Sequence, residues 1–135
     1  MDLASLRYLV IDDVLTMRKL VTQVLTSHGA TTISGVGRLN QAWEMLVQTA
    51  KEGKPFQMII CDWHMPDGSG VDFAKKCRAH PIYKDVGFLM LTTETKIDNV
   101  VNAMLAGIDN YDVKPVQEDV LLRKLRAIAK KRFTD

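Results

Sequence analysis

The sequence has few cysteines and no long hydrophobic run. Its 135 residues include only two cysteines, Cys61 and Cys77, without a CxxC pair, which predicts buried thiols in a reducing cytoplasm rather than a disulfide framework. The apolar runs reach about five residues, far below the roughly 20 needed to cross a membrane. No basic segment with a long apolar stretch opens the chain, so no signal peptide is predicted. The three histidines lack zinc-ligand spacing.

A large excess of charge is also absent. The formal net charge is +2, and the chain is 47% hydrophobic and 25% charged, which is an ordinary globular balance. Nothing in these totals points to nucleic acid or to a membrane surface. No glycine-rich loop follows the first apolar run, which disfavours a phosphate-loop nucleotide-binding protein. The length predicts one compact domain over residues 1–135, expected to be a monomer without an output domain.

Five short apolar runs alternate with five amphipathic patterns along the chain. Ser69 with Asp72, and Thr95 with Asp98, fit capping boxes that open the third and fourth helical patterns. Near-continuous apolar strands alternating with helices predict an α/β protein with a parallel sheet covered on both faces. The predicted strands span 8–11, 31–34 (near an edge), 58–61, 88–91 and 111–113, and the predicted helices span about 17–28, 39–50, 71–77, 98–105 and 116–133.

Polar side chains follow four of the predicted strands. Asp12 and Asp13 follow the first strand, Asp62 the third, Thr92 the fourth and Lys114 the fifth. Because parallel strands have their carboxyl ends at the same edge of a sheet, we expect these five side chains to converge there.

This set of side chains favours phosphoryl transfer. Carboxylates packed together raise one another's pKa, and a hard divalent cation relieves the repulsion. Carboxylates, a loop carbonyl and waters are the ligands that Mg2+ prefers. A hydroxyl and an ammonium beside the metal stabilise the oxygens of a transferred phosphoryl group, and Asp62 then becomes the nucleophile that forms an aspartyl phosphate.

The whole chain resembles the receiver domains of two-component response regulators, in particular the single-domain chemotaxis regulators. The resemblance is carried by "VIDDVLTMRKLV", "CDWHMPDGSGVDF", "MLTTETK" and "YDVKP". It implies a flavodoxin-like (βα)5 doubly wound sheet with strand order 2-1-3-4-5. It also implies a single receiver domain over residues 1–135 that acts as a phosphorylation-activated switch rather than as an enzyme.

The resemblance assigns roles to residues at the predicted site. Asp62 is the phosphoacceptor, and Asp13 is a more direct Mg2+ ligand than Asp12. The Lys114–Pro115 peptide bond is expected to be cis. The implied residues are, for the metal, Asp12, Asp13, Asp62 and the main-chain oxygen of His64; for the phosphoryl group, Thr92 and Lys114; for the switch, Thr92 and Tyr111; for the dephosphorylation rate, His64 and Glu94; and for the partner surface, Lys96, Met104, Tyr111 and Lys124.

The implied partners are a histidine kinase of the chemotaxis type and a flagellar motor switch protein or a phosphatase. The alternative within the family is a phosphorelay shuttle or a phosphate sink that never contacts the motor. A different class, the haloacid dehalogenase-type phosphatases, also uses an aspartate at a strand end with Mg2+. That class has a second aspartate two residues later, where this chain has His64.

The chain departs from the family pattern at several places. The loop after Asp62 is MPDGSG instead of the usual MPxMDG, which changes its flexibility and the start of the next helix. Thr93 replaces a small residue and narrows access to the phosphoryl group. Asp112, unusual in the last strand, is interpreted as an edge-strand charge that discourages strand addition.

Overall fold

The residues that the structure describes form one five-stranded sheet flanked by five α-helices. The computed structural model describes residues 2–94 and 96–133. A short 3-10 helix, Leu3–Ser5, precedes the sheet. The sheet strands are β1 Arg7–Ile11, β2 Thr32–Val36, β3 Met58–Asp62, β6 Gly87–Thr92 and β7 Asn110–Val113; the helices are α1 Leu15–Ser27, α2 Leu39–Lys51, α3 Gly70–Arg78, α4 Ile97–Leu105 and α5 Glu118–Phe133.

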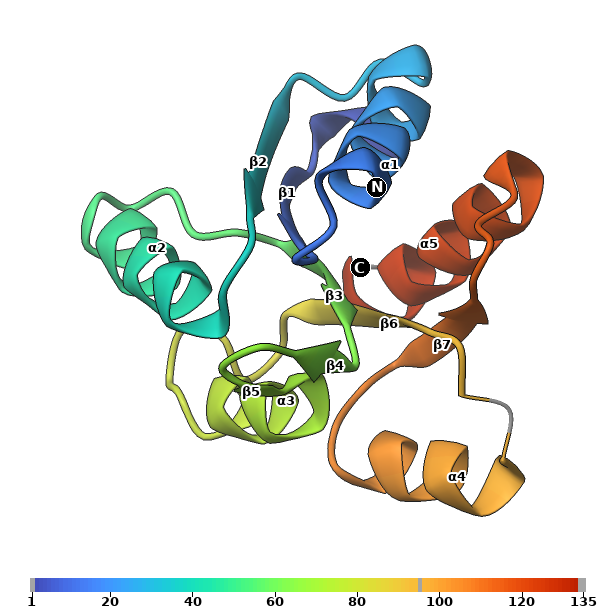
Figure 1. Cartoon of the computed structure of the whole chain (residues 1–135). Helices are drawn as coiled ribbons and strands as arrows, with labels where there is room; N and C mark the ends of the chain where they lie inside the picture. The colour runs from blue at the N-terminus through green and yellow to red at the C-terminus, as the bar shows by residue number, and fades with distance from the viewer. Residues whose placement is uncertain (1, 95, 134–135) are drawn as a thin grey trace.

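All five strands run parallel, in the order β2-β1-β3-β6-β7 (Figure 1). Counted along the chain, this is the predicted order 2-1-3-4-5, so the flavodoxin-like expectation is confirmed. The predicted position of the second strand at an edge is also confirmed. The order changes direction between β1 and β3, and the carboxyl ends of these two strands form the crevice where ligands bind in such sheets.

Each face of the sheet carries its own hydrophobic core. Helices α2, α3 and α4 cover one face, where Leu46, Phe73 and Ala103 pack against Ile59 and Phe88. Helices α1 and α5 cover the other face. Because the central strands are buried on both faces, their residues are apolar without alternation, as in "MIIC" and "FLML". Cys61 and Cys77 are free and buried, as predicted.

The observed boundaries of the helices and strands lie within two residues of the predicted ones. Strand β2 continues to Val36, beyond the predicted end at 34, because its register with β1 pairs Val10 with Gly35 and Ile11 with Val36. Helix α4 begins at Ile97 with Lys96 at its N-cap position. The predicted capping residue Thr95 lies outside the described residues.

The segment after β3 forms a small hairpin where the sequence predicted a loop. Strands β4 His64–Met65 and β5 Gly68–Ser69 pair antiparallel, with His64 opposite Ser69 and Met65 opposite Gly68. Met65 is buried in the core, which holds the hairpin against the protein. Ser69 caps α3 by accepting a hydrogen bond from the Val71 N–H, so this part of the predicted capping box is confirmed.

Among residues 2–94 and 96–133, no helix combines the length and the apolar character that crossing a membrane requires.

Candidate functional site

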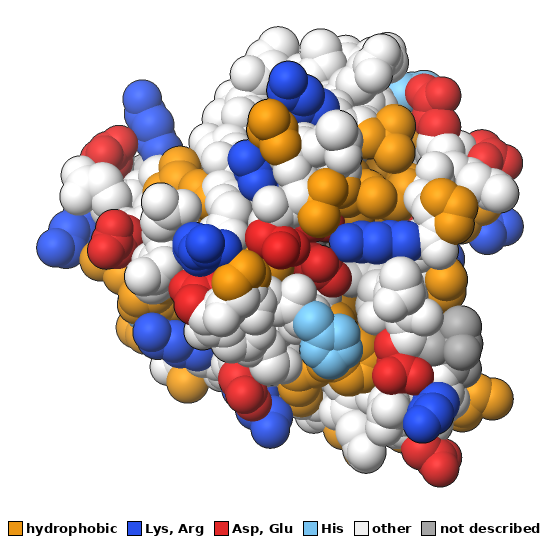
Figure 2. All heavy atoms as spheres, viewed as in Figure 1, with side chains coloured by type: hydrophobic (Ala, Val, Ile, Leu, Met, Phe, Trp, Pro, Cys, Tyr) orange, Lys and Arg blue, Asp and Glu red, His pale blue; other side chains and the backbone are white. Residues whose placement is uncertain are grey.

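Three carboxylates meet at the carboxyl ends of β1 and β3. These strands are neighbours, and Ile11 pairs with Cys61, so the residues that follow each of them lie side by side. One carboxylate oxygen each from Asp12, Asp13 and Asp62 lies within 4.8 Å of the others. Asp12 is buried, Asp62 is half-buried and Asp13 is exposed. Acidic side chains gather near the middle of the visible face in Figure 2, beside a basic side chain.

Both carboxylate oxygens of Asp12 already have partners in the protein. The Val14 N–H donates to Oδ1 at 2.9 Å, and the Lys114 ammonium donates to Oδ2 at 2.9 Å. Arg18 donates to the Asp12 main-chain oxygen at 2.7 Å. Asp12 therefore holds the β1–α1 loop and Lys114 in place, and it leaves Asp13 and Asp62 more open to a further ligand.

Lys114 lies between two of the carboxylates. Its Nζ is 2.9 Å from Asp12 and 3.2 Å from Asp62, and its backbone N–H donates to the Thr92 carbonyl at 2.9 Å. Burial lowers the pKa of the Lys114 ammonium, but the hydrogen bond to Asp12 and the charges of Asp12 and Asp62 raise it above its ordinary value. The predicted cis bond between Lys114 and Pro115 is confirmed.

The pKa of the Asp62 carboxyl is raised above its ordinary value. Desolvation is the main cause; Lys114 opposes it, and repulsion by Asp12 adds to it. The backbone is also crowded at this point. A Cβ on Gly70 would collide with the Asp62 carbonyl oxygen, and the Gly70 N–H donates to the Trp63 carbonyl at 2.7 Å. Glycine at position 70 therefore allows the chain to pass close to the main-chain carbonyl of Asp62.

Thr92 and Glu94 form a tight turn beyond β6. The Thr92 side chain is buried, and its hydroxyl oxygen accepts a hydrogen bond from the Glu94 N–H at 2.9 Å. One carboxylate oxygen of Glu94 accepts from the Lys96 N–H at 2.8 Å, close to the start of α4. His64 is exposed, and its ring stacks on Trp63 with ring centroids 5.7 Å apart.

Tyr111 and Asp112 on β7 both contact Lys124 of α5. The Lys124 ammonium donates to the Tyr111 carbonyl at 2.6 Å and lies 5.1 Å from the centre of the Tyr111 ring. It also lies 3.6 Å from Oδ1 of Asp112. Among the described residues, Asp112 Oδ2 has no hydrogen-bond partner.

The interpretation of Asp112 as a solvent-facing edge charge is wrong. The residue is only 5% exposed, and its Oδ1 lies 3.6 Å from the ammonium of Lys124 on α5.

The residues of the predicted partner surface come from α4, β7 and α5. Lys96 and Met104 are exposed, while Tyr111 and Lys124 are partly buried. Helix α4 also exposes Ile97, Val101 and Leu105, with Leu105 82% exposed. This helix therefore presents an apolar surface to solvent.

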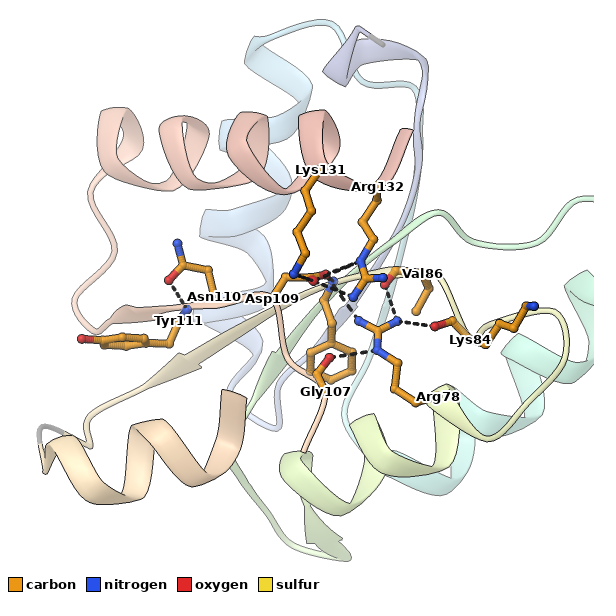
Figure 3. Close-up of polar contacts among 10 residues, drawn as sticks. Arg78, Lys84, Val86, Gly107, Asp109, Asn110, Tyr111, Lys131 and Arg132 are labelled. Carbon is orange, nitrogen blue, oxygen red and sulfur yellow. Dashed lines mark hydrogen bonds and ion pairs between the residues drawn. The ribbon is translucent and has the colours of Figure 1, made fainter. Parts of the chain in front are cut away.

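An ionic cluster around the buried Asp109, at the opposite end of the sheet, was not predicted from the sequence. Asp109 accepts hydrogen bonds from Lys131 at 2.9 Å, from Arg132 at 2.7 Å and from the Phe88 N–H at 2.9 Å, and Arg78 lies 3.4 Å away (Figure 3). Burial raises the pKa of Asp109, but the hydrogen bonds of Arg132, Lys131 and Phe88 outweigh it and hold the pKa below its ordinary value.

Asp67 in the β4–β5 turn was also missed. Its carboxylate accepts hydrogen bonds from the backbone N–H groups of Leu39 and Asn40 at 2.9 and 3.0 Å. The sequence contains one indication of this contact. Arg38 lies just before the second helical pattern, where a residue with a capping side chain is preferred, so the cap has to come from elsewhere.

Comparisons with known proteins agree with this geometry. Residues 8–126 match the family described as "Response regulator receiver domain". The chain is 34% identical over 123 residues to the "Chemotaxis protein CheY homolog" of Campylobacter jejuni, covering 91% of this chain and 92% of that protein. It is 35% identical over 123 residues to "Chemotaxis protein CheY1" of Helicobacter pylori, covering 91% and 96%. The solved chemotaxis response regulator CheY4 of Vibrio cholerae superposes with a TM-score of 0.78 at 30% identity, covering 91% of this chain and 98% of that one.

Proposed function

The chain belongs to the family of response regulator receiver domains, and from this membership we propose that it is a phosphorylation-activated signalling switch. A histidine kinase of the chemotaxis type supplies the phosphoryl group, and Asp62 accepts it. The observation that carries this proposal is the position of Lys114 beside the carboxylates of Asp12 and Asp62. One group is accepted and later hydrolysed in each signalling cycle, so the chain acts as a switch and not as an enzyme that turns over a metabolite.

The carboxylates supply the donor atoms that Mg2+ prefers. Asp12, Asp13 and Asp62, with the main-chain oxygen of His64, would hold the ion. Asp13 is the more direct ligand, because both oxygens of Asp12 already accept hydrogen bonds. When bound, Mg2+ neutralises charge on the carboxylates and on the phosphoryl oxygens.

The transfer step uses the ionised form of Asp62. A carboxylate oxygen of Asp62 attacks phosphorus and forms a P–O bond, while the P–N bond to the kinase histidine breaks. The imidazole leaves with the electron pair of that bond and takes up a proton. The Lys114 ammonium, 3.2 Å from Asp62 Oδ2, stabilises the negative charge that gathers around the phosphoryl oxygens.

The switch connects the phosphoryl group to the surface of α4, β7 and α5. The Thr92 hydroxyl accepts from the Glu94 N–H and still has its own hydrogen to donate to a phosphoryl oxygen. Drawing Thr92 toward the phosphoryl group moves the turn at Glu94 and the start of α4. Tyr111 then changes its rotamer, and the contacts of Lys124 are redistributed.

The proposed output is binding of an acidic segment, from a flagellar motor switch protein or a phosphatase, to the partner surface of Lys96, Met104, Tyr111 and Lys124. The apolar residues that α4 exposes and the basic Lys124 suit such a segment. Affinity should rise on phosphorylation by about 1–3 kcal/mol, the usual size of an allosteric coupling. Titration of an acidic motor-switch peptide, with and without beryllofluoride, measures this. Equal affinities would instead favour a phosphorelay shuttle or a phosphate sink.

Intact-mass measurement after incubation with acetyl phosphate tests the phosphoacceptor. The wild-type protein should gain one phosphoryl group in the presence of Mg2+ and none after addition of EDTA. Asp62→Ala should gain none, whereas the exposed Asp98→Ala on α4 should behave like the wild type. Modification of Asp62→Ala at the wild-type rate, or the absence of any effect of EDTA, would refute the assignment.

A further inference from the structure

The residue at the N-cap position of α2 supplies no capping side chain. Arg38 is at the N-cap position and makes no capping hydrogen bond. The first N–H groups of a helix have no intrahelical acceptor and need one from elsewhere. Asp67 supplies it from 28 residues further along the chain: its Oδ1 accepts from the Leu39 N–H and its Oδ2 from the Asn40 N–H. We call this arrangement the Asp67 cap.

The charge of Asp67 suits this position. A carboxylate is favoured beside a helix N-terminus, where the helix dipole is positive. Slight desolvation raises the pKa of Asp67, but the hydrogen bonds from Asn40 and Leu39 outweigh it and hold the pKa below its ordinary value. The Asp67 cap therefore stabilises the ionised form of the Asp67 carboxyl.

Asp67 also belongs to the hairpin that follows the phosphoacceptor. Its turn joins β4 to β5, and His64, the first residue of β4, lies two residues after Asp62. The tip of the hairpin is thus connected to α2 while its base continues directly from β3. At the base, the Gly70 N–H donates to the Trp63 carbonyl at 2.7 Å and closes the hairpin.

Packing brings the hairpin directly against the start of α2. Gly68 has a φ of +151°, and a Cβ on it would lie 3.2 Å from Cδ1 of Leu39. Leu39 donates its N–H to Asp67 and is itself buried in the core. The hairpin is therefore held at its tip by two hydrogen bonds and along its side by Leu39.

We propose that Asp67 is a positioning residue for the metal site, acting through the backbone of His64. The inference rests on the proposed Mg2+ site, in which His64 contributes its main-chain oxygen. A main-chain ligand cannot be adjusted by a side-chain rotamer, so its position depends on the path of the hairpin. Without the Asp67 cap the hairpin samples more positions, and binding of Mg2+ has to restrict them. Residues that orient metal ligands typically change affinity by about 10- to 100-fold.

Titration of Mg2+ against the unphosphorylated protein, followed by tryptophan fluorescence, gives a test that does not depend on phosphoryl transfer. Trp63 follows Asp62 directly and reports on the site. Asp67→Ala should bind Mg2+ about tenfold more weakly. Asp67→Asn keeps one acceptor oxygen, so its Mg2+ affinity should lie between those of Asp67→Ala and the wild type. This variant replaces Asp67→Ala in the test if Asp67→Ala does not fold. Asp72→Ala, which removes an exposed acid from the first turn of α3, should bind like the wild type.

A double variant separates positioning from general stability. Arg38→Asp gives α2 a local cap, so Arg38→Asp/Asp67→Ala should regain the stability lost in Asp67→Ala. Its Mg2+ affinity should stay about tenfold weaker than that of the wild type, because the hairpin still lacks its hydrogen bonds to α2. If the double variant regains Mg2+ affinity together with stability, or if Asp67→Ala binds Mg2+ like the wild type, the positioning role of Asp67 is wrong. Either result would leave the proposed function intact. Failure of the wild-type protein to bind Mg2+ would overturn the proposed function as well.

Discussion

The Lys114 ammonium lies 3.2 Å from the Asp62 carboxylate that we propose as the phosphoacceptor. In the proposed reaction Lys114 stabilises the charge on the phosphoryl oxygens, so Lys114→Ala should slow phosphorylation by acetyl phosphate by about 100-fold, the usual effect of removing one such group. Mg2+ affinity should not fall, because the variant removes a cation that already occupies the carboxylates. Rates from intact-mass time courses and Mg2+ titrations measure the two effects. Lys51→Ala, on the exposed end of α2, is the matched control; a wild-type phosphorylation rate in Lys114→Ala would contradict the role.

His64 should affect how long the phosphoryl group lasts without affecting metal binding. Its ring is exposed and stacks on Trp63, and only its main-chain oxygen is proposed as a ligand. We expect His64→Asn to speed dephosphorylation about fivefold, a barrier change of about 1 kcal/mol, because a smaller side chain opens the path of water to the site. The dephosphorylation rate of both proteins should be measured at one fixed pH after removal of the phosphodonor. An unchanged rate, or a large loss of Mg2+ affinity, would be inconsistent with this role.

Lys124 should be more important to stability than Asp112, although the two residues form one pair. Lys124→Met leaves the buried Asp112 carboxylate without the cation beside it and should cost about 1–3 kcal/mol. Asp112→Leu should change the free energy of unfolding by less than about 1 kcal/mol, because Lys124 keeps its hydrogen bond to the Tyr111 carbonyl.

Urea unfolding of the two single variants and of Lys124→Met/Asp112→Leu tests this asymmetry. The double variant should regain most of the stability lost in Lys124→Met, since its buried carboxylate is gone. Lys19→Met on α1 controls for the loss of an exposed charge. A larger loss in Asp112→Leu than in Lys124→Met would show that the carboxylate is the stabilising member of the pair.

The Asp109 cluster should make stability depend on pH. Asp109→Asn leaves the partly buried guanidinium groups of Arg78 and Arg132 without their carboxylate and should cost about 3–5 kcal/mol at neutral pH. The folded-state pKa of Asp109 is depressed, so its contribution is complete above the unfolded-state pKa of about 3.9 and is lost as the pH falls through the folded-state value. The difference between wild type and Asp109→Asn should therefore be constant above about pH 5 and shrink below about pH 4.

Urea unfolding of both proteins from pH 3 to 7 gives this difference directly. Asp98→Asn, at an exposed position in the first turn of α4, should show little difference at any pH. A difference for Asp109→Asn that stays constant down to pH 3 would mean that the charge of Asp109 does not stabilise the fold.

The parallel sheet covered by helices on both faces could be predicted from the sequence because it depends on local patterns. Runs such as "MIIC" are apolar along their whole length only when both faces of a strand are buried, and the alternation with helices then requires a parallel sheet. The meeting of Asp12, Asp62 and Lys114 follows from that topology, since the carboxyl ends of parallel strands lie at one edge.

The structural consequences of the departures from the family pattern could be recognised only in the tertiary structure. The segment MPDGSG was identified as altered, but its sequence does not reveal that Asp67 caps a helix 28 residues earlier. Asp112 was correctly identified as unusual, but its expected position toward solvent was wrong. The alternation of side chains along a four-residue strand does not show which face of that strand a long side chain of α5 will cover.

The sequence pattern therefore determined the fold class and the residues that meet at the carboxyl edge, and the family resemblance supplied the strand order. The tertiary structure decided the partners of Asp67, Asp109 and Asp112. Their contacts join residues 12 to 31 positions apart, between elements that come together only when the helices pack on the sheet. The local sequence around an aspartate is the same whether its carboxylate is exposed or paired in the folded protein. Only the neighbours that pack against it supply the N–H groups and cations that decide between the two outcomes.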